Sequence, residues 1–127
     1  MIPSTRPVKN QIGFHEKINL IDNAAGNIYL DPQISSTHLI KPTANIRLYI
    51  SAIPTEINIP NDCLIQLFVI IHPAVTGKTL TFDPSITWNY MPNLTITLTQ
   101  NNDLAFHFFT YDSGATWKGL FSGSFGA

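Results

Sequence analysis

Charge is scarce in this chain. Only 12% of its 127 residues are Asp, Glu, Lys or Arg, about half of the ~25% that is usual for globular domains. Seven basic residues, scattered along the sequence, face eight acidic ones and leave a formal net charge of −1. No basic stripe exists to neutralise a phosphate backbone, so we do not expect nucleic-acid binding. A surface with so little charge favours partial coverage by a protein partner.

Cysteine and long apolar runs are scarce as well. Cys63 is the one cysteine, which excludes an internal disulfide, and the apolar residues 64–71 that follow predict a buried thiol. The longest apolar run, residues 67–71, is far below the ~20 residues that span a bilayer. Residues 1–7 lack the apolar segment of a cleavable signal peptide. We therefore expect no membrane span, and a protein that is made in a cytoplasm without export.

Catalytic and metal-binding patterns are also missing. The histidines show no HxH, HxxH or HExxH spacing; they are His15, His38, His72 and His107. Residues 77–79 resemble the end of a phosphate-binding loop, but His72 occupies the position that this loop requires to be glycine. No GxSxG elbow or Cys–His signature is present. We expect no enzyme activity, no metal and no cofactor; a folded histidine site or a carboxylate pair for glycoside hydrolysis is a minor alternative.

What the sequence does contain is alternation with a period of two. Leu94, Ile96 and Leu98 alternate with threonines, and no apolar 3.6-residue pattern lasts for three turns. Residues typical of turns separate the expected strands, which are 13–21, 26–30, 37–40, 46–51, 56–59, 64–72, 78–82, 85–90, 94–99, 104–109 and 116–121. The pattern predicts an all-β fold, with residues 13–127 forming a single antiparallel, jelly-roll-like β-sandwich. Residues 1–12, with two prolines, are expected to form an extended N-terminal arm.

Aromatic residues supply the candidate ligand-binding surface. Stacking on sugars is the functional interpretation for four of them, Trp88, Tyr90, Tyr111 and Trp117. The favoured alternative is that these rings cover the ends of the sandwich core.

The C-terminal half carries a series of motifs that is more specific. Residues 80–88 read LTFDPSITW, residues 91–95 read MPNLT, and residues 104–119 read LAFHFFTYDSGATWKG. The series resembles a β-domain of bacteriophage virion surface proteins, in which a TFPSxVxW strand precedes a Pro-Thr/Asn-Leu strand, an apolar strand and a DGGTTWYG hairpin. Trp88 and Trp117 match the two tryptophans, residues 112–114 match the hairpin turn, and residues 125–127 match the tail. The likeness spans about residues 18–127 and is strongest over the last fifty. Residues 89–91 replace a Gly-Gly turn, and Ser113 replaces a glycine.

The resemblance implies a non-enzymatic virion structural protein, a capsid decoration or head-fibre protein assembled in the host cytoplasm. Its partners would be other virion proteins, either the major capsid protein or a tail component, with the arm as attachment element. A homo-oligomer such as a trimer is expected. The alternative is a tail-fibre or carbohydrate- and receptor-binding module that takes a host glycan on the four aromatic residues. The resemblance transfers no catalytic residue.

Overall fold

The structure, a computed structural model, describes residues 17–57, 59, 63–89 and 94–126. These residues form an all-β domain, which confirms the predicted fold class. The strands are β1 (Ile18–Leu30), β2 (Thr37–Ile50), β3 (Ile65–Ile71), β4 (Thr79–Phe82), β5 (Thr87–Trp88), β6 (Thr95–Thr97), β7 (Asp103–Thr110) and β8 (Lys118–Phe125). The expected arm, residues 1–12, lies outside the described residues. No helix in the described part is long and apolar enough to cross a membrane.

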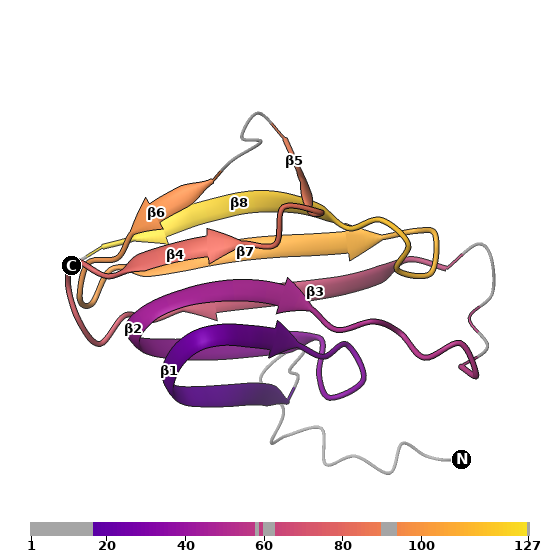
Figure 1. Cartoon of the computed structure of the whole chain (residues 1–127), viewed down its shortest axis with the longest axis horizontal. Helices are drawn as coiled ribbons and strands as arrows, with labels where there is room; N and C mark the ends of the chain where they lie inside the picture. The colour runs from indigo at the N-terminus through magenta and orange to yellow at the C-terminus, as the bar shows by residue number, and fades with distance from the viewer. Residues whose placement is uncertain (1–16, 58, 60–62, 90–93, 127) are drawn as a thin grey trace, which may run out of the picture.

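The strands form one sheet that winds in successive layers. We call each layer a rung, and β1 is the first rung and β2 the second. β1 pairs with β2 in parallel from Ile18–Thr37 to Leu30–Ile50. β2 pairs in parallel with β3 through its first half and with β4 through its second half, so β3 and β4 together make a third rung. β7 and β6 pair antiparallel with β3 and β4 and form a fourth rung of opposite direction. β8 lies antiparallel to β7, and β5 lies parallel to β8. The result is a mixed, strongly curled half-barrel (Figure 1).

The predicted antiparallel sandwich is therefore corrected to a single mixed sheet. The turn expected between the predicted strands 13–21 and 26–30 does not end a strand but bends β1. Asn23 and Gly26 have positive φ values of 50° and 72°, and the register with β2 shifts beside them. Because β1 bends back on itself, its end lies on the same side of the sheet as its start (Figure 1). The short loop of residues 31–36 can then start a parallel partner, where a straight strand would need a long crossover.

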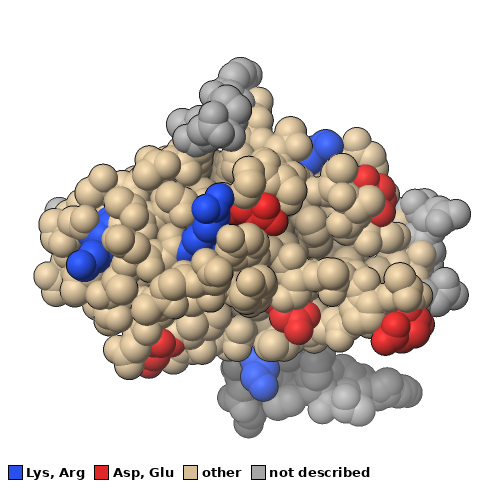
Figure 2. Space-filling view, viewed as in Figure 1, with Lys and Arg blue, Asp and Glu red and all other residues tan. Residues whose placement is uncertain are grey.

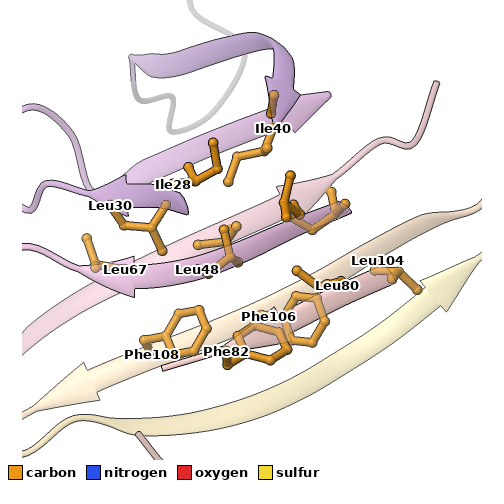
Figure 3. Close-up of a cluster of buried hydrophobic side chains, with 14 of the residues drawn as sticks. Ile28, Leu30, Ile40, Leu48, Leu67, Leu80, Phe82, Leu104, Phe106 and Phe108 are labelled. Atoms are coloured by element: carbon orange, nitrogen blue, oxygen red, sulfur yellow. The ribbon is translucent and has the colours of Figure 1, made fainter. Parts of the chain in front are cut away.

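The bends divide the sheet into two halves that face each other. We call them the first arm and the second arm of the sheet, and they are distinct from the expected N-terminal arm. The first arm contains residues 18–21 of β1, residues 37–40 of β2, β3, β7 and β8, and the second contains residues 26–30, residues 46–50, β4 and β6. Apolar side chains from both arms fill the space between them (Figure 3), and Leu30, Ile40, Leu48, Leu67, Leu80, Phe106 and Phe108 are fully buried. Burying one such side chain contributes about 1.5–3 kcal/mol. The core is therefore what holds the two arms together.

Backbone hydrogen bonds between rungs continue around the corner. His72 N donates to Ile40 O at 2.8 Å, and Ala74 N donates to Pro42 O at 3.0 Å. On the next rung, Leu98 N donates to Lys78 O at 2.7 Å. Because these peptide groups have partners, the chain can turn the corner without leaving buried polar groups unpaired.

Three local expectations also differ from the structure. Residues 55–57 form a turn rather than the predicted strand, because Ile57 N donates to Pro54 O at 3.1 Å; residue 58 lies outside the described residues. In the predicted strand 85–90, of which residues 85–89 are described, Thr87–Trp88 is the part that pairs. Asp83 Oδ1 accepts from Ser85 N and starts a turn before it. Cys63 is exposed rather than buried, because it precedes the start of β3 and does not take part in its alternation.

Candidate functional site

The outward surface of the first arm is mainly apolar. One row of register partners crosses five strands and consists of Ile18, Thr37, Phe68, His107 and Leu120. The two neighbouring rows add Leu20, Leu39, Ile70, Ala105 and Gly123 on one side and Gln66, Phe109, Lys118 and Thr87 on the other. Lys118 is the only Lys, Arg, Asp or Glu in these three rows. We call this surface the apolar face.

Several large side chains of the apolar face are open to solvent. Leu20 is 51% exposed, Ile18 48%, Phe68 38% and Leu120 37%. Gln66 Oε1 and His107 Nε2 lie 2.8 Å apart within it and satisfy each other. Contiguous apolar surface of this kind typically marks a contact with another macromolecule.

The outward surface of the second arm is polar. Its central row consists of Asn27, Arg47, Thr81 and Thr95. Beside it, the Tyr29 and Tyr49 rings stack with centroids 5.1 Å apart and planes inclined by 22°. Arg47 Cζ lies 5.9 Å from the centroid of Tyr49. Figure 2 shows few charged side chains on this side of the molecule, with one basic and one acidic side chain in contact near the centre and no large patch of one sign.

A groove of about 150 Å³ lies next to Arg47. We call it the Arg47 groove, and it is lined by Arg47, Thr81, Phe82, Asp83, Pro84, Trp88, Leu94 and Thr95. Arg47 and Asp83 both line it without forming an ion pair; in the described part of the chain the ion pair joins His72 Nδ1 to Asp103 Oδ1 at 2.6 Å. The Arg47 Nε atom is buried without a hydrogen-bond partner among the described residues.

Of the four predicted aromatic residues, the three that the structure describes do not share one surface. Trp117 is 8% exposed and belongs to the core, whereas Tyr111 is 60% exposed and has Lys118 Nζ 5.3 Å from its ring centroid. Trp88 is half-buried and packs edge to face on Phe82, with centroids 4.7 Å apart. Tyr90 lies outside the described residues.

Trp88 nevertheless separates two hollows. On one side it lines the Arg47 groove. On the other it lines a groove of about 390 Å³ together with Phe109, Lys118, Gly119 and Leu120. The stacked Tyr29 and Tyr49 were missed by the sequence analysis, because their contact depends on a parallel register 20 residues apart that alternation alone does not show.

The predicted hairpin turn at residues 112–114 is confirmed. Asp112 Oδ1 accepts hydrogen bonds from Thr110 Oγ1 at 2.6 Å and Thr116 N at 3.0 Å, and Oδ2 accepts from Thr116 Oγ1 at 2.5 Å. Hydrogen bonds from Thr110 and Thr116 lower the pKa of Asp112 to about 2. Ser113 and Gly114 both have positive φ, at 59° and 90°. Asp112 therefore closes the turn between β7 and β8.

The titratable groups do not assemble into a reactive centre in the described part. No group of three or more His, Cys, Asp or Glu side chains there could hold a metal ion. His38 is fully buried, and burial lowers its pKa. Its Nε2 lies 3.0 Å from Ser35 O and its Nδ1 lies 3.1 Å from Asn19 Nδ2. This environment fits a neutral ring that donates from Nε2 and accepts at Nδ1.

Comparison with known proteins adds no family. No family model matches the chain, no curated protein matches it, and no solved structure matches it. The likeness to phage virion modules therefore stays a prediction from the motifs of the sequence.

Proposed function

We propose that this chain is a non-enzymatic structural protein of a bacteriophage particle, a capsid decoration or head-fibre protein bound to other virion proteins. The motifs around Trp88, Trp117 and the Asp112 turn support the phage assignment. The structural observation that carries the docking role is the apolar face, where Ile18, Leu20, Phe68 and Leu120 are 37–51% exposed.

The free energy available at the apolar face suits an assembly protein. Fully burying an Ile, Leu or Phe side chain contributes about 1.5–3 kcal/mol. Completing the burial of four side chains that are already about half covered therefore contributes roughly 3–6 kcal/mol. Loss of translational and rotational freedom costs a similar amount or more. The contact is then weak for one isolated subunit, and it becomes stable where further contacts or a symmetric oligomer add to it.

The chemistry of the described side chains supports a role without catalysis. The two charged residues of the Arg47 groove, Arg47 and Asp83, face a shallow hollow, and no general base lies within hydrogen-bond distance of a nucleophile there. His72 and Asp103 pair with each other at the corner of the coil.

The test is to count copies of the protein in purified particles of the virus that encodes it, by quantitative mass spectrometry against the major capsid protein. Hundreds of copies would support a decoration or head-fibre role. A handful to a few dozen would replace it with the second candidate, a tail-fibre component. Absence from particles would overturn the structural proposal.

A matched pair of variants tests the docking surface itself. Phe68→Lys on the apolar face should abolish incorporation into particles, because it places a charge in the centre of the contact. Thr97→Lys on the outward surface of the second arm is the control and should incorporate normally. Both sites are exposed, so both variants should fold. Equal incorporation of the two would show that the apolar face is not the contact.

A further inference from the structure

The Arg47 groove has the composition of a ligand site. Side chains with unused hydrogen-bonding capacity line it together with a fixed aromatic ring. We propose that the Arg47 groove binds a neutral saccharide, with one pyranose ring seated between Arg47, Asp83 and Trp88. This inference goes beyond the structural role proposed above and does not depend on where the protein sits in a particle.

Arg47 supplies the donors. Among the described residues its Nε has no hydrogen-bond partner and its guanidinium forms no ion pair, and Cζ lies over the Tyr49 ring. A guanidinium carries five N–H donors in a fixed plane. Leaving such a group without acceptors in a partly buried place is unfavourable. A ligand with hydroxyl oxygens would provide them.

Asp83 supplies the acceptor. Its Oδ1 accepts from Ser85 N at 3.0 Å, an arrangement that fixes the carboxylate at the end of β4. Thr95 is exposed on the neighbouring strand β6 and adds a hydroxyl. Adjacent hydroxyls of a sugar can donate to a carboxylate and accept from a guanidinium at once.

The presence of both charges in one groove favours a neutral ligand. Arg47 and Asp83 line the same hollow without forming an ion pair. A phosphate would be attracted by Arg47 but repelled by Asp83. An ammonium group would be attracted by Asp83 but repelled by Arg47. A polyhydroxylated neutral molecule satisfies both side chains without placing a new charge beside either.

Trp88 supplies the apolar wall. Its ring packs on Phe82 and Phe108, with centroids 4.7 and 5.6 Å away, and is held at both sites edge to face. A Cβ built at Gly119 would lie 2.9 Å from Trp88 Cζ3, so the indole sits directly on the β8 backbone. A ring fixed in this way can stack on the C–H face of a pyranose at little entropic cost.

The size of the Arg47 groove sets the extent of the ligand. Its volume of about 150 Å³ is below the ~300–1,000 Å³ of pockets that enclose drug-sized ligands. It therefore suits a single sugar ring, with the rest of a glycan in solvent or along Tyr49 and Tyr29. Binding of one ring should be weak, with a dissociation constant on the order of 1 mM, and repeated display on an oligomer would strengthen it.

The test is an NMR titration of the isolated protein with glucose, galactose, N-acetylglucosamine and lactose, each at tens of millimolar. We expect at least one sugar to shift the Trp88 Nε1–H and Arg47 Nε–H resonances. Arg47→Gln should weaken that binding at least tenfold, and Asp83→Asn should weaken it several-fold. Lys118→Gln, on the opposite side of Trp88, is the matched control and should bind as the wild type does.

Three results would overturn the proposal. The first is that no sugar of the panel shifts these resonances while the thermal midpoint shows a folded protein. The second is that the shifts cluster around Lys118 and Leu120 and survive Arg47→Gln. The third is that inorganic phosphate binds more tightly than every neutral sugar, which would identify an anion site. Particle copy number is measured separately, so failure here leaves the virion proposal standing.

Discussion

Gly119 offers the sharpest test of the packing around Trp88. A Cβ atom at this position would lie 2.9 and 3.0 Å from two carbons of the Trp88 indole and 3.1 Å from Phe108 Cε1. Ordinary contacts between carbons are 3.5–4.0 Å. Phe108 is fully buried, so at least one of two large rings must move when Gly119 becomes Ala.

The size of the effect follows from two opposing terms. Forcing a methyl group into a packed site typically costs about 1–3 kcal/mol. Replacing glycine in extended backbone recovers about 0.4–1 kcal/mol by restricting the unfolded chain. We expect Gly119→Ala to lower the free energy of unfolding by about 1–2 kcal/mol. The midpoint of thermal unfolding should fall by roughly 3–10 °C.

Gly123 on the same strand is the matched control. A Cβ there would meet only Phe125 Cζ and Cε1, at 3.3 and 3.4 Å, and Phe125 is 65% exposed and free to turn away. Gly123→Ala should therefore change stability by less than about 1 kcal/mol. Urea unfolding followed by circular dichroism compares the two variants, and acrylamide quenching reports whether the indole becomes more accessible. Equal stability of Gly119→Ala and wild type, with unchanged quenching, would refute the placement of Trp88 on β8.

Three further predictions concern titration and reactivity. The pKa of Asp112, about 2, lies below its ordinary value of 3.8, so the carboxylate stabilises the fold above about pH 4 and loses this effect between pH 4 and pH 2. The urea midpoints of wild type and Asp112→Asn should converge over that range, and parallel curves would contradict the turn network. Burial lowers the pKa of His38 below 6.5, so protonation favours the unfolded chain; stability should decline below about pH 6.5 in the wild type and less in His38→Gln, again by urea midpoint. Exposed Cys63 should react fully with Ellman's reagent without denaturant, and protection of the thiol would contradict its placement.

The sequence predicted the positions of the strands better than it predicted which strands pair. The alternation at residues 104–109 and the apolar run at residues 64–72 correctly marked β7 and β3, because alternation records which side chains face the core. It does not record which strand lies alongside. Residues 23–27 carry the same Asn and Gly in a bend as in a hairpin, so the parallel coil could not be distinguished from an antiparallel sandwich.

For the same reason, only part of the candidate site could be predicted from the sequence. Trp88 was singled out as a possible stacking residue and lies beside two hollows. Trp117 could not be separated from it, since a large aromatic residue has the same composition signal in a core and in a groove. Arg47 and Asp83 come together only through the pairing of β2 with β4, and Tyr29 meets Tyr49 only through the pairing of β1 with β2. Contacts of this kind depend on long-range register, which the sequence of a single strand does not contain.

The coil has a consequence for lengthening the protein. β1 and β2 are joined after 19–20 residues in the same register and direction, whereas β6 and β7 run against the third rung and end the parallel series. A new rung can therefore enter by insertion between Leu30 and Thr37 without reversing any strand. A duplicated unit of about 20 residues would carry its own bend, its own inward apolar residues and its own loop, as the units of stacked-repeat proteins do. The parallel series can therefore be lengthened on the side of β1 and β2, whereas β6 and β7 end it on the other side.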